Sequence, residues 1–147
     1  MAAVRRAEVV WEGTLARGSG KVTAASSSAF SELPVSWASR TERSDGKTSP
    51  EELVAAAHAS CFAMALSFGL GNAGTPPERL EVSATVTFDQ VDGGWKVVSS
   101  ALTVRGTVPG LDDAGFKQAA DGAKDGCPIS QALKGNVALS VDASLAG

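Results

Sequence analysis

The fold is decided by PEELVAAAHASCFAMALSFGL, residues 50–70 of the 147-residue sequence. Ser49 precedes this stretch and Glu52 follows three residues later, which is the Ser-x-x-Glu pattern of a capping box at a helix start. Pro50 at the first helical position removes a backbone N–H that would have no partner there. The sequence therefore predicts a helix that begins at Pro50 and ends near Leu70, where glycines become frequent.

Apolar or small side chains occupy every face of this predicted helix from Leu53 to Leu70. A helix that is apolar on all sides has to be buried on all sides. A single antiparallel sheet would cover only one side, so the helix predicts an obligate homodimer in which a second subunit covers the other. The helix is also long enough to span a membrane. Only a minority of its residues are strongly lipophilic, however, so we expect no membrane insertion.

Strands are expected on both sides of this helix. The clearest is LEVSATVTF, residues 80–88, where apolar and polar side chains alternate strictly. Asp92-Gly93-Gly94 then predicts a hairpin turn into a partner strand over residues 95–108. Further strands are predicted at residues 7–12, 20–26, 33–37 and 137–141, and further helices at residues 112–124 and 129–133. Locally paired strands with separate helices predict one α+β domain over residues 1–147, rather than a doubly wound parallel sheet.

Composition and charge exclude several functional classes. Thirteen basic and sixteen acidic residues give a formal net charge of −3 without a long basic run, so we expect no nucleic-acid partner. Two cysteines and one histidine are too few for a tetrahedral zinc site or for a secreted disulfide scaffold. Residues 1–15 lack the continuous apolar core of a signal peptide, so we expect a cytoplasmic protein. The two thiols are the remaining candidates for chemistry.

Cys61 and Cys127 stand in different surroundings. Cys61 lies in the middle of the apolar helix, where a buried thiol has a raised pKa and is commonly inert. Cys127 precedes the short predicted helix, whose positive N-terminal end favours a thiolate. Helix electrostatics alone therefore favour Cys127 as the nucleophile, although an inert turn cysteine is an equal alternative. His58 is three residues from Cys61, but a hydrogen-bonded core histidine is the more common role than a catalytic pair with cysteine.

Charged side chains flank the loop before the helix, among them Arg40, Arg43 and Glu51. A nucleophilic thiolate in an apolar pocket needs a nearby cation, and arginine suits this because it stays charged and can also hold a carboxylate. Glu51, in the first turn of the helix, is placed to orient such an arginine. The alternative roles are solvated charge and stabilisation of the helix N-terminus, and both alternatives stay open at this point.

Two motifs carry a family resemblance. PEELVAAAHASCFAMAL at residues 50–66, together with GCPIS at residues 126–130, resembles the Ohr/OsmC family of bacterial organic hydroperoxide reductases, and most closely its OsmC branch. The similarity extends over nearly the whole chain, through WEG (11–13), RGSGKV (17–22), LSFGLGNAG (66–74), VDGGW (91–95), VPGLD (108–112) and ISQALKG (129–135).

This resemblance implies a thiol peroxidase without a metal or haem cofactor. It implies that Cys61 is the peroxidatic cysteine and Cys127 the resolving one, the reverse of the order that helix electrostatics favour. It also implies an ion pair of Arg40 and Glu51 beside the Cys61 sulfur. The loop before the helix is slightly longer than in some members of the family, which leaves Arg43 as an alternative to Arg40. The implied fold is an intertwined homodimer, with antiparallel sheets wrapped around long central helices and active sites at the subunit interface.

On this resemblance we expect the Cys61 thiolate to attack an organic hydroperoxide and become a sulfenic acid, which Cys127 converts into a disulfide. An external dithiol, by family analogy a lipoyl group, then restores both thiols. Phe62, Met64 and Phe68 are expected to line an apolar substrate pocket that favours alkyl hydroperoxides over hydrogen peroxide. The alternatives are a thiol-based redox sensor or small-molecule-binding protein without turnover, and a protein whose cysteines are inert core residues.

Overall fold

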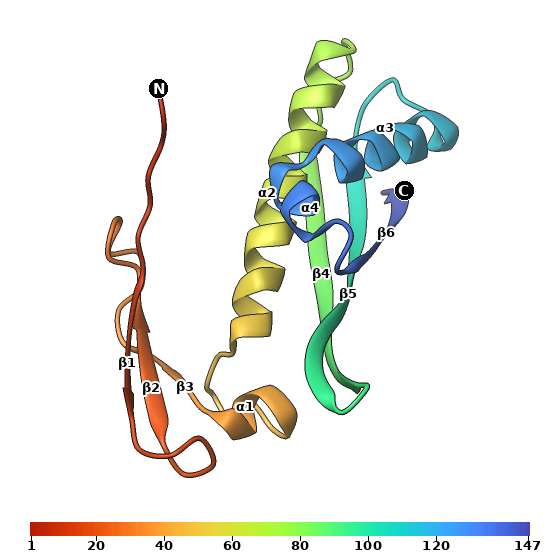
Figure 1. Cartoon of the computed structure of the whole chain (residues 1–147). Coiled ribbons are helices and arrows are strands. Elements are labelled where there is room, and N and C mark those ends of the chain that lie inside the picture. Colours follow the sequence, from red (N-terminus) through yellow and green to blue (C-terminus); the bar gives the residue numbers. More distant parts are fainter. The chain divides into compact units, whose positions relative to one another are not determined.

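Two compact units, Met1–Leu53 and Val54–Gly147, make up the computed structural model, which describes all 147 residues (Figure 1). Their elements follow in the order β1 (Glu8–Glu12), β2 (Ser19–Thr23), β3 (Leu33–Val35), α1 (Trp37–Thr41), α2 (Pro50–Asn72), β4 (Arg79–Val91), β5 (Gly94–Thr107), α3 (Asp113–Gly126), α4 (Pro128–Leu133) and β6 (Ala138–Leu145). Helices combined with two small sheets confirm the α+β class. The assignment of residues 1–147 to a single domain stays a prediction.

The first unit contains a three-stranded antiparallel sheet in the order β1-β2-β3. Val22 of β2 and Val35 of β3 are its buried apolar side chains. The sequence pattern predicted that the third strand continues through Trp37, but Trp37 begins helix α1. That prediction is wrong because Ser36 and Ser39 form a reciprocal cap. Ser39 N–H donates to Ser36 Oγ over 3.1 Å, and Ser36 N–H donates to Ser39 Oγ over 3.0 Å.

Helix α2 begins at Pro50, as predicted. Glu52 N–H donates a hydrogen bond to Ser49 Oγ over 3.1 Å, so Ser49 caps the helix. The Glu52 carboxylate accepts a hydrogen bond from the Thr48 hydroxyl, at 2.7 Å, instead of closing the predicted capping box. The helix ends at Asn72, slightly beyond the predicted end.

The second unit contains a three-stranded sheet in the order β4-β5-β6. Asp92 and Gly93, both at positive φ (52° and 82°), form the predicted tight turn between β4 and β5. Half-buried and exposed side chains alternate along most of β4, also as predicted. β6, however, pairs with β5 in parallel, so the expectation of antiparallel sheets is wrong for this strand. The chain between β5 and β6 forms α3 and α4, and such a helical crossover returns the chain in the same direction.

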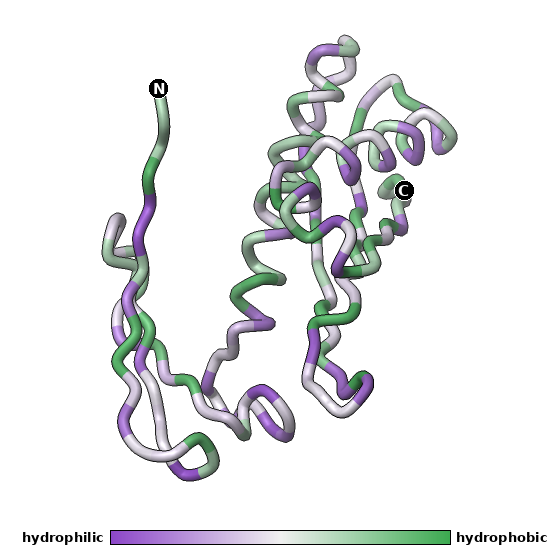
Figure 2. The backbone as a smooth tube through the Cα atoms, viewed as in Figure 1, coloured by the Kyte–Doolittle hydropathy of each residue, from purple (hydrophilic) through white to green (hydrophobic).

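The core of the second unit is built mainly from α2, β5 and α3. Phe62, Leu66 and Leu70 recur every fourth residue along α2 and are at most 2% exposed. Gly106 of β5 makes room for Phe116 of α3, because a Cβ at Gly106 would lie 2.5 Å from the tip of the Phe116 ring. Apolar residues, drawn in green, recur along α2 in Figure 2. This packing fixes the middle of α2, where the first candidate cysteine lies.

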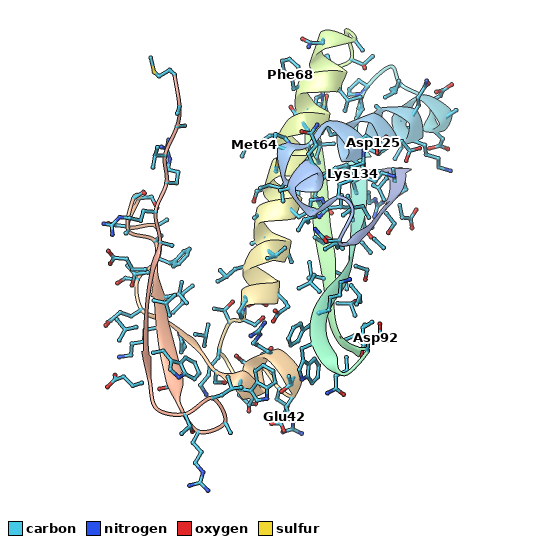
Figure 3. The ribbon with its side chains drawn as sticks, viewed as in Figure 1. Glu42, Met64, Phe68, Asp92, Asp125 and Lys134 are labelled. Atoms are coloured by element: carbon cyan, nitrogen blue, oxygen red, sulfur yellow. The ribbon has the colours of Figure 1, made fainter.

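A second face of α2 is open to solvent in the single chain. Met64 and Phe68 are 70% and 71% exposed, and both side chains are labelled in Figure 3. By length and composition alone, α2 is also able to cross a membrane. The all-round burial that the sequence predicts is therefore met on one side of the helix only.

Candidate functional site

Two free thiols meet in the second unit. Cys61 lies in the middle of α2 and is partly exposed, whereas Cys127 lies between α3 and α4 and is fully buried. Cys61 packs against the buried cluster that contains Cys127, and the two thiols act on each other's pKa. The fold thus brings together the two cysteines that the sequence singles out. No group of three or more His, Cys, Asp or Glu side chains gathers into a metal-binding cluster anywhere in the chain.

The surroundings of the two sulfurs change their acidity in opposite directions. Burial raises the pKa of Cys61, and the neighbouring Cys127 raises it further, while the backbone N–H of Ile129 lowers it. Burial also opposes ionisation of Cys127, but the neighbouring Cys61 thiol and the polar groups of Ser130 and Ile129 together lower the pKa of Cys127. Cys127 is therefore the more acidic thiol and Cys61 the accessible one. None of the groups that act on the pKa of Cys61 is a cation.

His58 lies one helical turn before Cys61 and is fully buried. Its Nδ1 lies 2.6 Å from Ser100 Oγ on β5, and its Nε2 lies 2.8 Å from Ser130 Oγ on α4. Burial lowers the pKa of His58 below its ordinary value, so the ring is neutral at neutral pH. Sequence reasoning missed both serines. Ser130 stands inside the GCPIS motif and offered a signal, whereas only the fold brings Ser100 to the ring.

The free energy of unfolding is expected to fall as the pH drops below about 6.5 because of His58. Its pKa in the folded chain is below the ordinary value of 6.5, so at lower pH the unfolded chain binds a proton that the native chain does not. The stability that the neutral His58 ring contributes is fully present above about pH 6.5. It is lost as the pH falls toward the folded-state pKa, by at most about 1.4 kcal/mol per pH unit. Urea unfolding of the wild-type chain and of His58→Gln at several pH values measures this pH dependence of the free energy of unfolding. Equal pH slopes for the two proteins would contradict the assignment.

Arg40 and Glu51 form an ion pair in the first unit. Arg40 Nε donates to Glu51 Oε1 over 3.1 Å and Nη2 donates to Oε2 over 2.8 Å, so the guanidinium holds the carboxylate through two hydrogen bonds. Arg40 Cζ also lies 5.5 Å from the centre of the Trp37 ring, within range of a cation–π contact. The structure therefore pairs the buried Glu51 with Arg40, and the exposed Arg43 lies outside this pair. The action of Arg40 on Cys61 stays a prediction.

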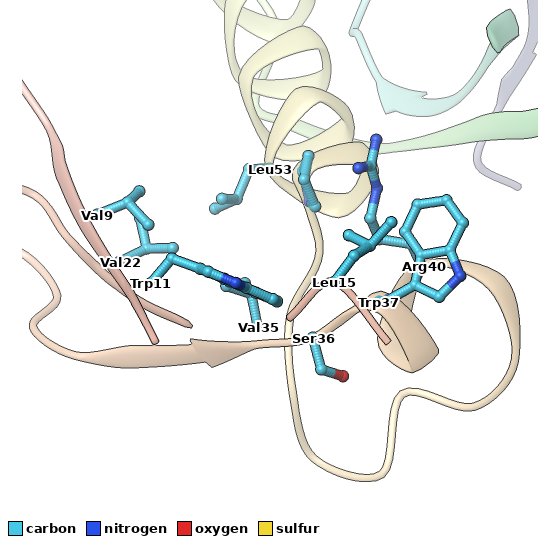
Figure 4. Close-up of a pocket in the computed structure, with 10 residues that line it drawn as sticks. Val9, Trp11, Leu15, Val22, Val35, Ser36, Trp37, Arg40 and Leu53 are labelled. Carbon is cyan, nitrogen blue, oxygen red and sulfur yellow. The ribbon is translucent and has the colours of Figure 1, made fainter. Parts of the chain in front are cut away.

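An apolar cavity of about 520 Å³ opens beside Arg40, within the first unit (Figure 4). Its lining consists of Val9, Trp11, Leu15, Val22, Val35, Ser36, Trp37, Arg40, Pro50 and Leu53. Arg40 is the one charged residue of this lining. A cavity with these walls suits a hydrocarbon chain that carries a polar or anionic group for the guanidinium. Trp11 belongs to the WEG motif, which was the available signal for this cavity.

The three residues that were expected to line a substrate pocket point in different directions. Phe62 is fully buried in the core, whereas Met64 and Phe68 are largely exposed. Helical geometry explains the separation, since residues two apart lie on nearly opposite faces and residues four apart share a face. Within this chain the three side chains therefore do not share one lining, and their contact with substrate stays a prediction.

Comparison with known proteins gives one consistent family. The family model described as OsmC-like protein matches residues 43–142. Peroxiredoxin OsmC of Escherichia coli (strain K12) is 41% identical over 135 residues, which cover 92% of this chain and 93% of that protein. An organic hydroperoxide resistance protein of Xanthomonas axonopodis pv. citri (strain 306) is 32% identical over 95 residues, covering 64% and 65% of the two chains. The crystal structure of the organic hydroperoxide resistance protein OhrB of Bacillus subtilis superposes with a TM-score of 0.74 at 25% identity, over 94% of this chain and 97% of that chain.

Proposed function

The chain belongs to the OsmC-like protein family, and we propose that it is a cysteine-based peroxidase that reduces organic hydroperoxides to alcohols. The names of its relatives, peroxiredoxin OsmC and organic hydroperoxide resistance protein, support a peroxide-related function. The observation that carries the proposal is the neighbouring pair of a partly exposed Cys61 and a fully buried Cys127, whose thiols act on each other's pKa. A two-cysteine reduction requires this arrangement, with one sulfur open to substrate and a second sulfur in contact with the first.

Oxidation begins at Cys61, because it is the accessible sulfur of the pair. Its thiolate attacks the terminal oxygen of the hydroperoxide, so that a sulfur–oxygen bond forms and the oxygen–oxygen bond breaks. The electron pair of the broken bond goes to the alkoxide, which takes up a proton and leaves as the alcohol. Cys61 is thereby oxidised to a sulfenic acid while the peroxide is reduced.

Cys127 then resolves the sulfenic acid. Its sulfur attacks that of Cys61, a disulfide forms, and the sulfenic oxygen leaves as water. We propose that a dithiol of the lipoyl type reduces the disulfide through a mixed disulfide. Because Cys127 is buried, the dithiol attacks Cys61, and Cys127 is the leaving thiolate. The lowered pKa of Cys127 favours its departure.

Arg40 is the residue that we propose as the cation for the Cys61 thiolate. Burial raises the pKa of Cys61, so the thiolate needs a positive charge to form at neutral pH. Glu51 fixes the Arg40 guanidinium through two hydrogen bonds, which orients the charge. The apolar cavity beside Arg40 fits the hydrocarbon part of the substrate, which favours alkyl hydroperoxides over hydrogen peroxide.

A peroxidase assay with several substrates and reductants tests the proposal. We expect dihydrolipoamide to sustain turnover, and cumene hydroperoxide to be consumed faster than hydrogen peroxide. Glutathione, a monothiol, should support much slower turnover. A single round of oxidation without turnover, in excess peroxide and dithiol, would instead identify a redox sensor. Two thiols that are not oxidised at all would contradict both functions.

We also propose that the exposed face of α2 packs against a second copy of the chain. Met64 and Phe68 stand one helical turn apart on this face, and they are 70% and 71% exposed although both are large and apolar. A second copy packed on this face is the simplest way to remove the exposed apolar surface of α2 from water.

Phe68→Glu is expected to convert the dimer into a monomer, because a buried carboxylate without a partner opposes association. Light scattering coupled to size-exclusion chromatography measures the mass. Val91→Glu places the same charge at another exposed apolar position of the second unit and is expected to leave the mass unchanged. A wild-type chain of monomeric mass, or a Phe68→Glu dimer, would refute the proposed interface.

A further inference from the structure

A buried path of polar side chains leads from the cysteine pair into the second unit. Ser130 stands three residues after Cys127 in the first turn of α4, where its side chain lowers the pKa of Cys127, and Ser130 Oγ lies 2.8 Å from His58 Nε2. On the far side of the ring, His58 Nδ1 lies 2.6 Å from Ser100 Oγ. All four residues are at most 1% exposed. Cys127 is therefore connected to a buried imidazole through one hydroxyl group.

The chemistry of a neutral imidazole restricts the directions of these hydrogen bonds. One ring nitrogen donates and the other accepts. While Cys127 is a thiol and His58 Nδ1–H donates to Ser100 Oγ, Nε2 accepts from the Ser130 hydroxyl, and Ser130 Oγ is left to accept the Cys127 S–H. This arrangement gives every member of the path a partner, in keeping with a chain that has no unsatisfied buried side-chain nitrogen or oxygen. Once Cys127 is a thiolate, the Ser130 hydroxyl donates to the sulfur instead, which is the direction that lowers the pKa of Cys127.

We propose that His58 and Ser130 relay the proton of Cys127 during disulfide formation, an inference that rests on the peroxidase function proposed above. As Cys127 attacks the Cys61 sulfenic acid, its proton passes to Ser130 Oγ while the hydroxyl proton of Ser130 passes to His58 Nε2. The sulfur–sulfur bond forms, the sulfur–oxygen bond breaks, and the departing hydroxide takes up one proton as His58 gives up the proton that it gained. The net reaction converts one sulfenic acid and one thiol into a disulfide and water. His58 is a positioning residue, since it acts on Cys127 only through Ser130.

Burial makes such a relay useful. A lone thiolate at a fully buried site would be an uncompensated charge, whereas the relay forms a thiolate and an imidazolium together and keeps the net charge of the site constant. The titratable groups nearest in sequence to the ring and its α4 partner are Cys61, three residues after His58, and Cys127, three residues before Ser130, while the partner of the ring on β5 is the Ser100 hydroxyl. The lowered pKa of His58 has burial as its cause, with no contribution from a charged neighbour.

Single-turnover kinetics with one equivalent of cumene hydroperoxide separate the two half-reactions. Sulfenic acid formation is followed by trapping with dimedone, and disulfide formation by the loss of the second thiol. Ser130→Ala and His58→Gln are each expected to slow disulfide formation at neutral pH at least about tenfold, and to change sulfenic acid formation less than about threefold. Ser100→Ala is the matched variant, because it removes an equally buried hydroxyl from the other ring nitrogen. It should destabilise the fold to a similar degree and slow disulfide formation much less.

The pH profile distinguishes a relay from a structural role. In the wild-type chain, disulfide formation should slow as the pH falls through the lowered pKa of His58, because a protonated ring accepts no proton. In His58→Gln this fall should be absent, and the rate should instead rise with pH about tenfold per unit until Cys127 ionises.

The outcomes separate the relay from the function on which it rests. A wild-type chain that forms no Cys61 sulfenic acid overturns the proposed function and the relay with it. The relay alone is overturned if Cys61 is oxidised normally and the two serine variants behave alike. They behave alike if Ser130→Ala and Ser100→Ala slow disulfide formation equally, or if neither variant slows it. If His58→Gln does not fold, the comparison of the two serine variants decides the question.

Discussion

Cys61→Ser is expected to lower kcat/KM for cumene hydroperoxide by at least about 10³-fold, because the serine hydroxyl has no adjacent base that would make it a nucleophile. The buried Cys127 should not take over, since Cys127 is fully buried and only Cys61 is partly exposed. Steady-state assays with dihydrolipoamide measure the loss, and thermal unfolding followed by circular dichroism shows that the variant is folded.

Cys127→Ser is the matched variant at the other sulfur. It should still reduce about one equivalent of peroxide per chain, lose sustained turnover, and accumulate Cys61 sulfinic acid when peroxide is in excess. The opposite result, with the first turnover lost in Cys127→Ser and kept in Cys61→Ser, would make the more acidic Cys127 the nucleophile. That result would contradict the roles proposed for both cysteines.

Arg40→Ala is expected to lower kcat/KM about 10²-fold, the usual cost of removing one group that stabilises charge in a buried site. It should also raise the pKa of Cys61, so that the pH at which Cys61 reacts half-maximally with iodoacetamide moves upward. Glu51→Gln should show a smaller effect in the same direction, because the guanidinium keeps its charge and loses an ionic partner.

Arg43→Ala is the control for Arg40, since Arg43 is exposed and outside the ion pair with Glu51. We expect its kcat/KM to stay within about twofold of the wild-type value, as for most surface substitutions. Equal losses of kcat/KM in Arg40→Ala and Arg43→Ala would show a general charge effect. An unchanged kcat/KM in Arg40→Ala would show that Arg40 does not act in the reaction.

Local signals in the sequence predicted much of the fold correctly. Ser49 and Pro50 set the start of α2 through backbone groups a few residues away, so their effect does not depend on the rest of the fold. Asp92 and Gly93 define the β4–β5 turn for the same reason, because both adopt the positive φ that the turn requires. The reciprocal cap of Ser36 and Ser39 is equally local, but the alternation of Leu33, Val35 and Trp37 around it favoured a strand over a helix start.

Features that depend on distant contacts could not be predicted. The parallel pairing of β6 follows from the path of α3 and α4, which no local pattern specifies. The His58–Ser100 contact joins α2 to β5 and needs the core packing of Phe62 and its neighbours. The sequence pointed to both cysteines, but their contact, and the exposure of only one of them, come from the fold.

The central claim is that Cys61 and Cys127 together reduce an organic hydroperoxide. The most direct measurement is to mix the reduced chain with one equivalent of cumene hydroperoxide, quantify the alcohol, and map the cysteines by mass spectrometry. Our account predicts one equivalent of alcohol per chain and an intramolecular Cys61–Cys127 disulfide. Unchanged thiols with no alcohol formed, or oxygen addition to the two cysteines without a disulfide between them, would contradict it.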